Sequence, residues 1–390
     1  MEDILQSKKE KRNFINNEIL EQEDKKENSP RIKEKLNKII LKIKNELDNN
    51  FKTKRKKGLK NFKKNENDYS YIHSLIQCMG GIPDILLFLI KNKNDLYNNA
   101  KKKPKTFAFF KIIDQLYEDK HQETIGNSAS FITIIGHCFP FLKANGKNPI
   151  DLYHLLLFGM HEELNSAEKN IINVRDDECY NKNSSILENE IIFFNNRNDS
   201  FISDTFNSFI KKEIKCTSCN NTFYELDNFY SFDLDAINTY REYNKKTLNI
   251  NDCLKYYIKP KNIKRICSIC HKKSNLILKK TIFESSKILV FVLTRNNSNE
   301  EEEMLTIKFN YKEIIDISDY IDSKLIKITA EYLLIGVVAF LFDEKKYVSF
   351  CKNLFYNEWI CFNEDSIREC NFDDMINSST PFILFYKRIE

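Results

Sequence analysis

Residues 216–219 read Cys-Thr-Ser-Cys and residues 267–270 read Cys-Ser-Ile-Cys, with 47 residues between the two pairs. Two thiolates separated by two residues grip one side of a tetrahedral Zn²⁺ ion from a tight turn, and a second such pair completes the shell. We therefore predict a structural zinc site, because no ligand position is left for water; the alternative is a set of unrelated buried cysteines. The expected ligands are Cys216, Cys219, Cys267 and Cys270, and the adjacent His271 is expected to be a bystander.

The hydrophobic period of the sequence changes near residue 200. Before it, apolar residues recur at the three- and four-residue spacing of helices over 71–92, 106–118, 129–142 and 149–164. After it, short runs rich in Ile, Val, Phe and Tyr alternate with turns, as in strands. These runs cover 222–236, 276–281, 288–295, 305–311, 332–342, 346–352, 359–362 and 381–388. Helices followed by strands predict an α+β architecture, and the Asn-rich stretch 165–200 is expected to be a flexible insertion.

The composition is that of a folded chain with unevenly distributed charge. Hydrophobic residues make up 42% and charged residues 30% of the 390 residues, which is enough for a substantial core. The net charge is +5, but residues 1–64 alone carry 20 Lys and Arg against 11 Asp and Glu, so the remainder is slightly acidic. A basic leader on an acidic body predicts contact with an acidic partner or a role in targeting.

Neither a secretory signal nor a membrane span is expected. Residues 1–12 are charged throughout, and no apolar run approaches the roughly 18 residues that a spanning helix needs. We therefore expect a soluble protein of the cytoplasm, the nucleus or both, without a membrane partner. In that reducing setting the 11 cysteines are expected to be thiols and metal ligands rather than disulfides.

The first 57 residues are expected to precede the folded body. Residues 1–30 are polar and charged, which predicts disorder. Residues 31–51 place apolar side chains at helical spacing, which predicts an amphipathic helix that docks a partner complex, packs on the body or is solvated. The basic run 52–57 is a nuclear address, a nucleic-acid patch or a solvated linker.

Four stretches, in order along the chain, resemble the boxes of the ubiquitin-specific protease family. Residues 58–61 (Gly-Leu-Lys-Asn) with 71–78 (Tyr-Ile-His-Ser-Leu-Ile-Gln-Cys) resemble its cysteine box. Residues 148–153 with 160–164 (Met-His-Glu-Glu-Leu) resemble the helix that follows, and the two cysteine pairs with 288–295 resemble its zinc finger and the next strand. The stretches that resemble the histidine box and the closing strands are 332–338, 347–350, 359–364 and 385–388.

This resemblance covers about residues 58–388 and implies a hand-shaped fold over 58–390. It implies a helical thumb over about 58–200, zinc-tipped fingers over about 210–285 and a β palm over about 286–390. In the family such a hand cradles ubiquitin or a ubiquitin-like protein, whose C-terminal tail runs between thumb and palm.

Family members cleave the isopeptide bond with a cysteine thiolate, a histidine base, an Asp or Asn that orients the histidine, and an Asn that binds the oxyanion. Counting back from Gln77, the nucleophile position falls on Ser70. The nearest thiol, Cys78, lies eight residues further along. That is about 12 Å along a helix, so we expect Cys78 to be a core residue.

The base position of the family falls on Lys346. All six histidines lie at or before residue 271, so the stretch that resembles the histidine box contains none. A lysine near its ordinary pKa of about 10.4 is protonated at pH 7 and does not accept a proton. A Ser70–Lys346 dyad would need burial to lower that pKa, so we expect the family's hydrolysis to be lost.

The two remaining catalytic positions fall on asparagines. The orienting position is Asn363 and the oxyanion position is Asn61. The stretch from Gly58 to Gln77 is four residues longer than the family's motif, which predicts that Asn61 is displaced from the nucleophile position. The triplet Asn-Asp-Tyr at 67–69 also resembles the inactive family member of the spliceosomal tri-snRNP, although the finger of that member lacks the cysteine pairs.

Three functions follow from these patterns. The first is a pseudoenzyme that keeps the fold to bind ubiquitin, a ubiquitin-like protein or an assembly partner. The second is a divergent but active deubiquitinase that uses Ser70 and Lys346. The third is a nuclear scaffold in mRNA splicing that is recruited through residues 31–57.

Overall fold

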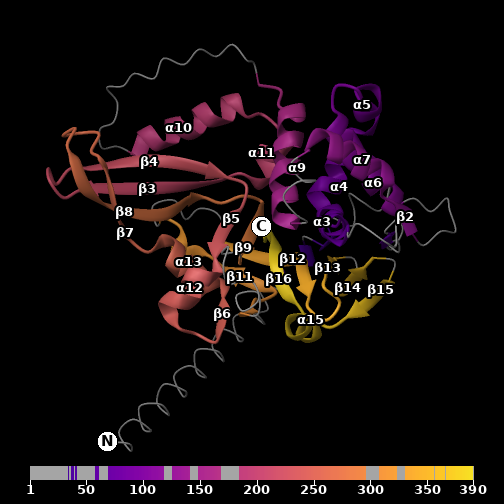
Figure 1. Cartoon of the computed structure of the whole chain (residues 1–390). Coiled ribbons are helices and arrows are strands. Elements are labelled where there is room, and N and C mark those ends of the chain that lie inside the picture. The colour runs from indigo at the N-terminus through magenta and orange to yellow at the C-terminus, as the bar shows by residue number, and fades with distance from the viewer. Residues whose placement is uncertain are drawn as a thin grey trace, which may run out of the picture.

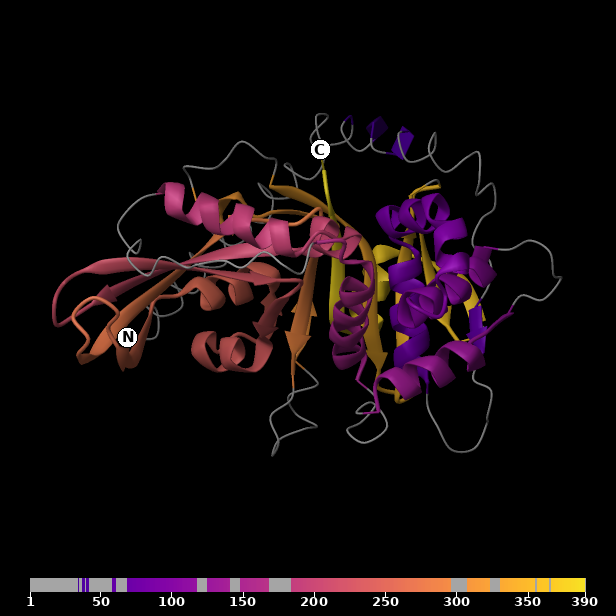
Figure 2. The same cartoon turned by 90° about the horizontal axis from the view of Figure 1, so that it is seen from above.

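Figures 1 and 2 show a computed structural model of the chain, in which a helical part, a large central sheet and a projecting β-sheet arm are joined. The structure describes residues 34, 37–38, 40–41, 58–60, 69–117, 125–140, 148–167, 184–295, 307–322, 330–354, 356–364 and 366–389. Helices dominate its first half and strands its second half, so the predicted α+β class is confirmed.

The thumb is built around one fully buried helix. Its helices are α3 (Ser70–Gly80), α4 (Pro83–Lys91), α5 (Lys93–Asn98), α6 (Pro104–Tyr117), α7 (Ala129–Cys138) and α9 (Pro149–Leu164). Every residue of α3 is buried, because this helix is enclosed between its neighbours and the central sheet. The predicted helix 71–92 is therefore wrong as a single element: α3 and α4 meet at 78°. Pro83 begins the second helix, where its missing N–H costs no hydrogen bond.

The helices of the thumb are short for membrane spans. Among the described residues, no single helix is both long enough and apolar enough to cross a bilayer, and the one pair that reaches the required length and hydropathy together is the bent α3–α4 pair.

The palm is an eight-stranded sheet in the order β15-β14-β13-β12-β16-β9-β5, with β11 paired to β12. Its strands are β5 (Phe232–Asp235), β9 (Ile288–Thr294), β11 (Ile314–Asp316), β12 (Glu331–Leu341), β13 (Lys346–Asn353), β14 (Glu358–Asn363), β15 (Ser366–Cys370) and β16 (Thr380–Arg388). One face packs on the thumb, where Leu75 and Leu157 meet Val338 and Phe385. The other face packs on α12 (Ala236–Tyr243), α13 (Ile250–Ile258) and α15 (Phe372–Ser378).

The fingers are a four-stranded antiparallel sheet that projects from the palm (Figure 1). Their strands, in spatial order, are β4 (Thr222–Phe229), β3 (Ser208–Cys216), β8 (Lys273–Glu284) and β7 (Lys261–Ile266). The predicted run 222–236 divides, because the chain leaves the fingers after Phe229, enters the palm as β5 and then begins α12. The short η1 helix (Ser318–Tyr320) lies between β11 and β12 in the chain.

Part of the expected flexible insertion is a helix. Residues 184–197 form α10 (Ser184–Arg197), and α11 (Phe201–Phe206) follows after a capping box at Ser200. Leu187 on α10 is buried against Phe209 and Phe283 of the finger sheet. The Asn-rich composition wrongly predicted a flexible segment over residues 184–197, because these apolar contacts outweigh the weak helix propensity of asparagine. Residues 168–183 lie outside the described part of the chain.

The predicted amphipathic helix 31–51 is described at five positions only. Glu34 and Lys38 form an ion pair of 2.8 Å on a helical turn. Ile40 packs against the thumb–palm core, whereas Leu41 is 58% exposed. Residues 1–30 and the basic run 52–57 lie outside the described residues.

A buried ion pair supports the palm and gives a first prediction. Lys352, whose side chain is 4% exposed, donates to Glu313 at 2.9 Å, and Trp359 Nε1 donates to the same oxygen at 2.5 Å. Glu313→Ala leaves the buried ammonium of Lys352 without its carboxylate partner, so we expect the free energy of unfolding to fall by about 2 kcal/mol. This is less than the loss of a fully buried ion pair would cost, because solvent screens the partly exposed Glu313. Urea unfolding followed by circular dichroism measures it. The exposed Asp343→Ala is the control, and equal stability of the two variants would contradict the prediction.

Candidate functional site

The four predicted zinc ligands lie together at the tip of the fingers. Their sulfur atoms all lie within 4.8 Å of one another, and the Sγ atoms of Cys219 and Cys267 are 3.9 Å apart. A tetrahedral Zn²⁺ with Zn–S bonds of about 2.3 Å separates its sulfurs by about 3.8 Å. The cluster therefore fits a structural zinc ion, as the spacing predicted.

The two cysteine pairs adopt matching turns. Cys216 N–H donates to Asn221 O at 2.9 Å, and Cys267 N–H donates to Lys272 O at 3.0 Å. The residue after each pair, Asn220 or His271, is left-handed, with φ of 57° and 54°. His271 is exposed and outside the ligand cluster, so its part in the site is to close the turn.

The environment of the cluster favours the thiolate at Cys216 and a closed site. Burial raises the pKa of Cys216, but hydrogen bonds from the backbone of Cys219 and Ser218 lower it, to about 6. The thiolate is the form that binds metal. A backbone hydrogen bond from Lys272 lowers the pKa of Cys270, but burial and hydrogen bonds with the other three sulfurs outweigh it and raise that pKa to about 11. Beneath the sulfurs lie the buried side chains of Ile214, Phe223 and Leu276, which form a small apolar cluster of their own. A metal held there would fix the two turns to the sheet.

The predicted nucleophile and base positions meet where thumb and palm touch. Ser70 is the first residue of α3 and is 1% exposed. Its Oγ accepts a hydrogen bond of 3.0 Å from the backbone N–H of Tyr347, which directly follows Lys346 at the start of β13. Ser70 thus contacts the residue that follows Lys346, 277 positions away in the sequence.

An acidic residue that the sequence analysis missed links the other two positions. Lys346 Nζ forms an ion pair of 2.8 Å with Glu344 Oε2, and Asn363 Nδ2 donates to the same oxygen at 3.1 Å. The hydrogen bond from Lys346, and then that from Asn363, lowers the pKa of the Glu344 carboxyl. Glu344 is therefore ionised near neutral pH. In the sequence, the only sign that Glu344 could contact Lys346 was its position two residues earlier, because residues at that spacing lie on the same side of an extended chain.

The nearby histidine and thiol of α3 are engaged elsewhere. His73 Nε2 lies 2.9 Å from Ser128 Oγ. Cys78 is 1% exposed, its Sγ lies 3.9 Å from that of Cys351, and a Cβ on Gly336 would lie 3.4 Å from it. Cys78 is thus a core residue, as expected.

The oxyanion position, Asn61, lies outside the described residues. The segment just before it is described: β1 (Gly58–Lys60) pairs in parallel with β2 (Ile125–Asn127). Leu59 is fully buried, and its N–H donates to Glu364 O at 3.1 Å. This bond places the start of the cysteine-box stretch beside the orienting position Asn363.

Comparison with known families identifies this arrangement. The model of the family described as "Ubiquitin carboxyl-terminal hydrolase" matches residues 57–386. The chain belongs to this family. Ubiquitin carboxyl-terminal hydrolase 2 of Bos taurus is 22% identical over 333 residues, which are 81% of this chain and 53% of the bovine protein. Usp2 of Drosophila melanogaster is 20% identical over 82% of this chain and 34% of its own length. The chain thus spans about half or less of these relatives.

Solved structures of the family share the fold. The SAGA Ubp8/Sgf11/Sus1/Sgf73 DUB module bound to ubiquitin aldehyde superposes with a TM-score of 0.62 at 16% identity, over 86% of this chain and 70% of that chain. The module solved as Ubp8-Sgf11-Sgf73-Sus1 gives a TM-score of 0.59 at 18% identity, over 86% and 68%. The predicted hydrolase-family hand with a four-cysteine cluster in its fingers is therefore confirmed.

Proposed function

We propose that this family member binds ubiquitin or a ubiquitin-like protein, as a partner in the ubiquitin system, without hydrolysing its conjugates. The observation that carries the proposal is the ion pair between Lys346 and Glu344, at the position that the resemblance to the histidine box assigns to the base. Family membership and the likeness to a module bound to ubiquitin aldehyde support the binding half of the proposal.

The side chain of Lys346 forms an ion pair and is not suited to act as a general base. Removing the Ser70 proton requires a neutral acceptor, and an ammonium that is paired with a carboxylate is favoured in its charged form. Pairing with Glu344 at 2.8 Å therefore works against proton transfer from Ser70. Ser70 Oγ already accepts the Tyr347 N–H, which orients the hydroxyl but does not activate it.

The state of Asn363 supports the same conclusion. Its amide nitrogen donates to Glu344, and within the described part of the chain its buried Oδ1 has no hydrogen-bond partner. In the family the orienting residue accepts a hydrogen bond from the imidazole of the base. Replacement of the histidine would leave the Oδ1 atom of Asn363 without a hydrogen-bond donor, as is found here among the described residues.

The zinc cluster belongs to the binding scaffold rather than to the chemistry. When bound, zinc would hold the two turns of the fingers together through Cys216, Cys219, Cys267 and Cys270. Four thiolates fill a tetrahedral shell, so the site offers no open position for a substrate. The fingers would then supply a rigid surface beside the palm.

The proposal predicts binding without turnover. We expect isothermal titration calorimetry to detect ubiquitin or a ubiquitin-like protein on the purified, zinc-loaded chain. With ubiquitin–aminomethylcoumarin, wild type and Ser70→Ala are expected to release fluorophore at the same background rate. Turnover by wild type that is lost in Ser70→Ala or Lys346→Ala would instead establish the divergent deubiquitinase. Both residues are suitable for this test because Ser70 contacts Tyr347, the residue after Lys346.

A role as a nuclear scaffold in splicing rests on residues 31–57 and stays a prediction. Deletion of that segment, with the protein imaged in cells, tests it. Unchanged nuclear retention after the deletion would contradict the scaffold role.

A further inference from the structure

The fingers carry a concentration of positive charge that differs from the rest of the body. Residues 208–229 and 261–284, which form the fingers, contain 10 Lys and Arg against four Asp and Glu, a net charge of +6, although residues 65–390 as a whole carry −4. Within this arm, residues 261–283 contain seven Lys and Arg and no Asp or Glu. A chain-wide lysine bias does not produce such a contrast between neighbouring regions.

The strand register gathers four of these cations on one face of the finger sheet. Paired residues share a face, and so do alternate residues of one strand. Lys215 pairs with Ile277, Lys264 pairs with Asn275, and positions 273, 275, 277 and 279 of β8 alternate onto that same face. This face carries the exposed side chains of Lys215, Lys264, Lys273 and Lys279, here called the lysine face, and it also carries Lys211 and Glu213 of β3.

The lysine face differs from the opposite face in its pairing. On the opposite face Arg265 of β7 pairs with Glu225, and Lys212 of β3 pairs with Asp227; both carboxylates lie on β4. Among the described residues, no ion pair involves Lys215, Lys264 or Lys273, whereas Lys279 lies directly opposite Glu213 on this face. The charge of the first three lysines is therefore available to a ligand.

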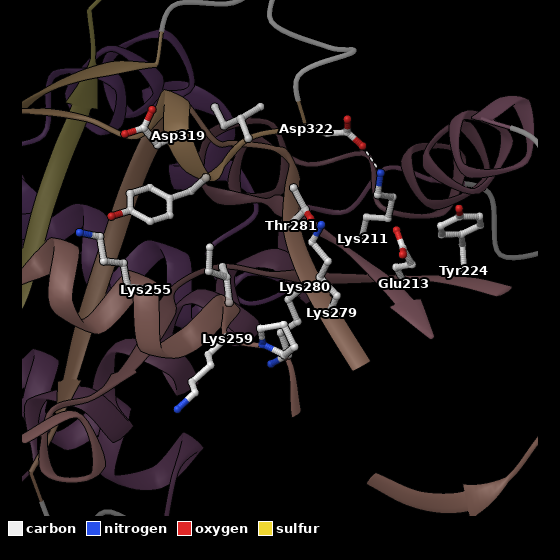
Figure 3. Close-up of a pocket in the computed structure, with 14 residues that line it drawn as sticks. Lys211, Glu213, Tyr224, Lys255, Lys259, Lys279, Lys280, Thr281, Asp319 and Asp322 are labelled. Carbon is white, nitrogen blue, oxygen red and sulfur yellow. Dashed lines mark hydrogen bonds and ion pairs between the residues drawn. The ribbon is translucent and has the colours of Figure 1, made fainter. Parts of the chain in front are cut away.

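A mixed-charge cavity bounds the lysine face at the root of the fingers (Figure 3). It has a volume of about 690 Å³ and lies between β8, the end of α13 and η1. Lys279 lines it together with Glu213 and Asp319, and Lys211 is paired with Asp322. These carboxylates end the uniformly positive surface, so an anionic ligand would lie on the outer part of the fingers.

The spacing of the lysine face fits a nucleic-acid backbone. Lys273 and Lys279 are six residues apart on β8, which is about 20 Å at 3.3 Å per residue. A positively charged surface of that length can follow the backbone of a single strand across several nucleotides. Ile266 and Ile277, which are 64% and 39% exposed, lie on the same face and offer apolar contact to bases.

An acidic peptide fits this face less well. Carboxylates are recognised best by the planar fork of arginine, whereas lysine acts as a point charge that contacts phosphates without reading sequence. Arg265, the arginine of this hairpin, faces the other way and is paired with Glu225. We propose that the lysine face of the fingers binds the phosphate backbone of single-stranded RNA or DNA without sequence preference.

The proposal is tested on the full-length, zinc-loaded protein by fluorescence anisotropy with a fluorescein-labelled 20-mer of uridine. Three to four lysine–phosphate contacts predict a log–log salt slope of about −2 to −3 for a single strand. Lys215→Glu/Lys264→Glu/Lys273→Glu is expected to weaken binding at least about tenfold at 50 mM salt and to flatten that slope by about two. The matched control is Lys91→Glu/Lys101→Glu/Lys102→Glu, which makes the same charge change at exposed positions of the thumb.

Two further arms distinguish binding at the lysine face from binding at the basic leader and from general affinity for polyanions. Lys54→Gln/Arg55→Gln/Lys56→Gln removes charge from the basic run of the leader. If this variant abolishes binding while the finger variant binds as tightly as the thumb control, the proposal is overturned. Tighter binding of a poly-glutamate peptide than of the RNA would also overturn it. The zinc content of the finger variant, which is expected to equal that of wild type, shows that its fingers are folded.

Discussion

Replacing Cys219 with serine is expected to unfold the outer part of the fingers while the thumb and palm stay folded. The reason is the small size of the core beneath the cluster, in which Ile214, Phe223 and Leu276 are the main apolar members. Structural zinc contributes on the order of 10–16 kcal/mol to the folding of small zinc domains. We expect the zinc content to fall from about one ion per chain to near zero, because three cysteines do not hold a structural ion tightly.

Metal analysis and hydrogen exchange measure this effect together. Amides of β3, β4, β7 and β8 are expected to lose protection in Cys219→Ser, whereas those of α3 and β12 keep it. Cys138→Ser, at a half-buried thiol on α7, is the matched control and should change neither the zinc content nor the finger protection. Full zinc occupancy in Cys219→Ser would show that the four sulfurs are not the ligand set.

The second large effect is expected on covalent capture of ubiquitin. Ubiquitin with a C-terminal propargylamide reacts with a cysteine thiolate that is placed at the end of the ubiquitin tail. Ser70→Cys/Lys346→His would put a thiol at the start of α3 and an imidazole beside Glu344 and Asn363, two groups that orient an imidazole. We expect this double variant to form a one-to-one adduct, which is seen by intact-protein mass spectrometry.

Wild type is expected to form no adduct, because a serine hydroxyl does not react and Cys78 is buried in the core. Ser70→Cys alone should react more slowly, since it has no imidazole beside it to accept the thiol proton. An adduct on wild type would show that another thiol reaches the C-terminus of bound ubiquitin. Failure of the double variant to react, although it binds ubiquitin, would show that Ser70 does not lie at the end of the tail.

Several features of this protein were determined by local sequence. The spacing of the four cysteines predicted their convergence, because a Cys-x-x-Cys turn positions both thiols whatever lies between the two pairs. The apolar periods over 106–118 and 149–164 predicted α6 and α9, because helical periodicity is written into a single stretch of chain. The position of the last histidine, at residue 271, settled that no imidazole follows the fingers in the sequence.

Other features were decided only by the tertiary structure. The bond between Ser70 and Tyr347 joins positions 277 residues apart, and Glu344 acquires its role from a turn that faces Asn363. The lysine face exists only through the register of β3, β7 and β8, since one residue of slip would turn each of its members to the other side. Local sequence patterns determine which segments form turns, helices or strands, but long-range pairing decides which of those segments come into contact. That pairing depends on the packing of the whole chain rather than on any one segment.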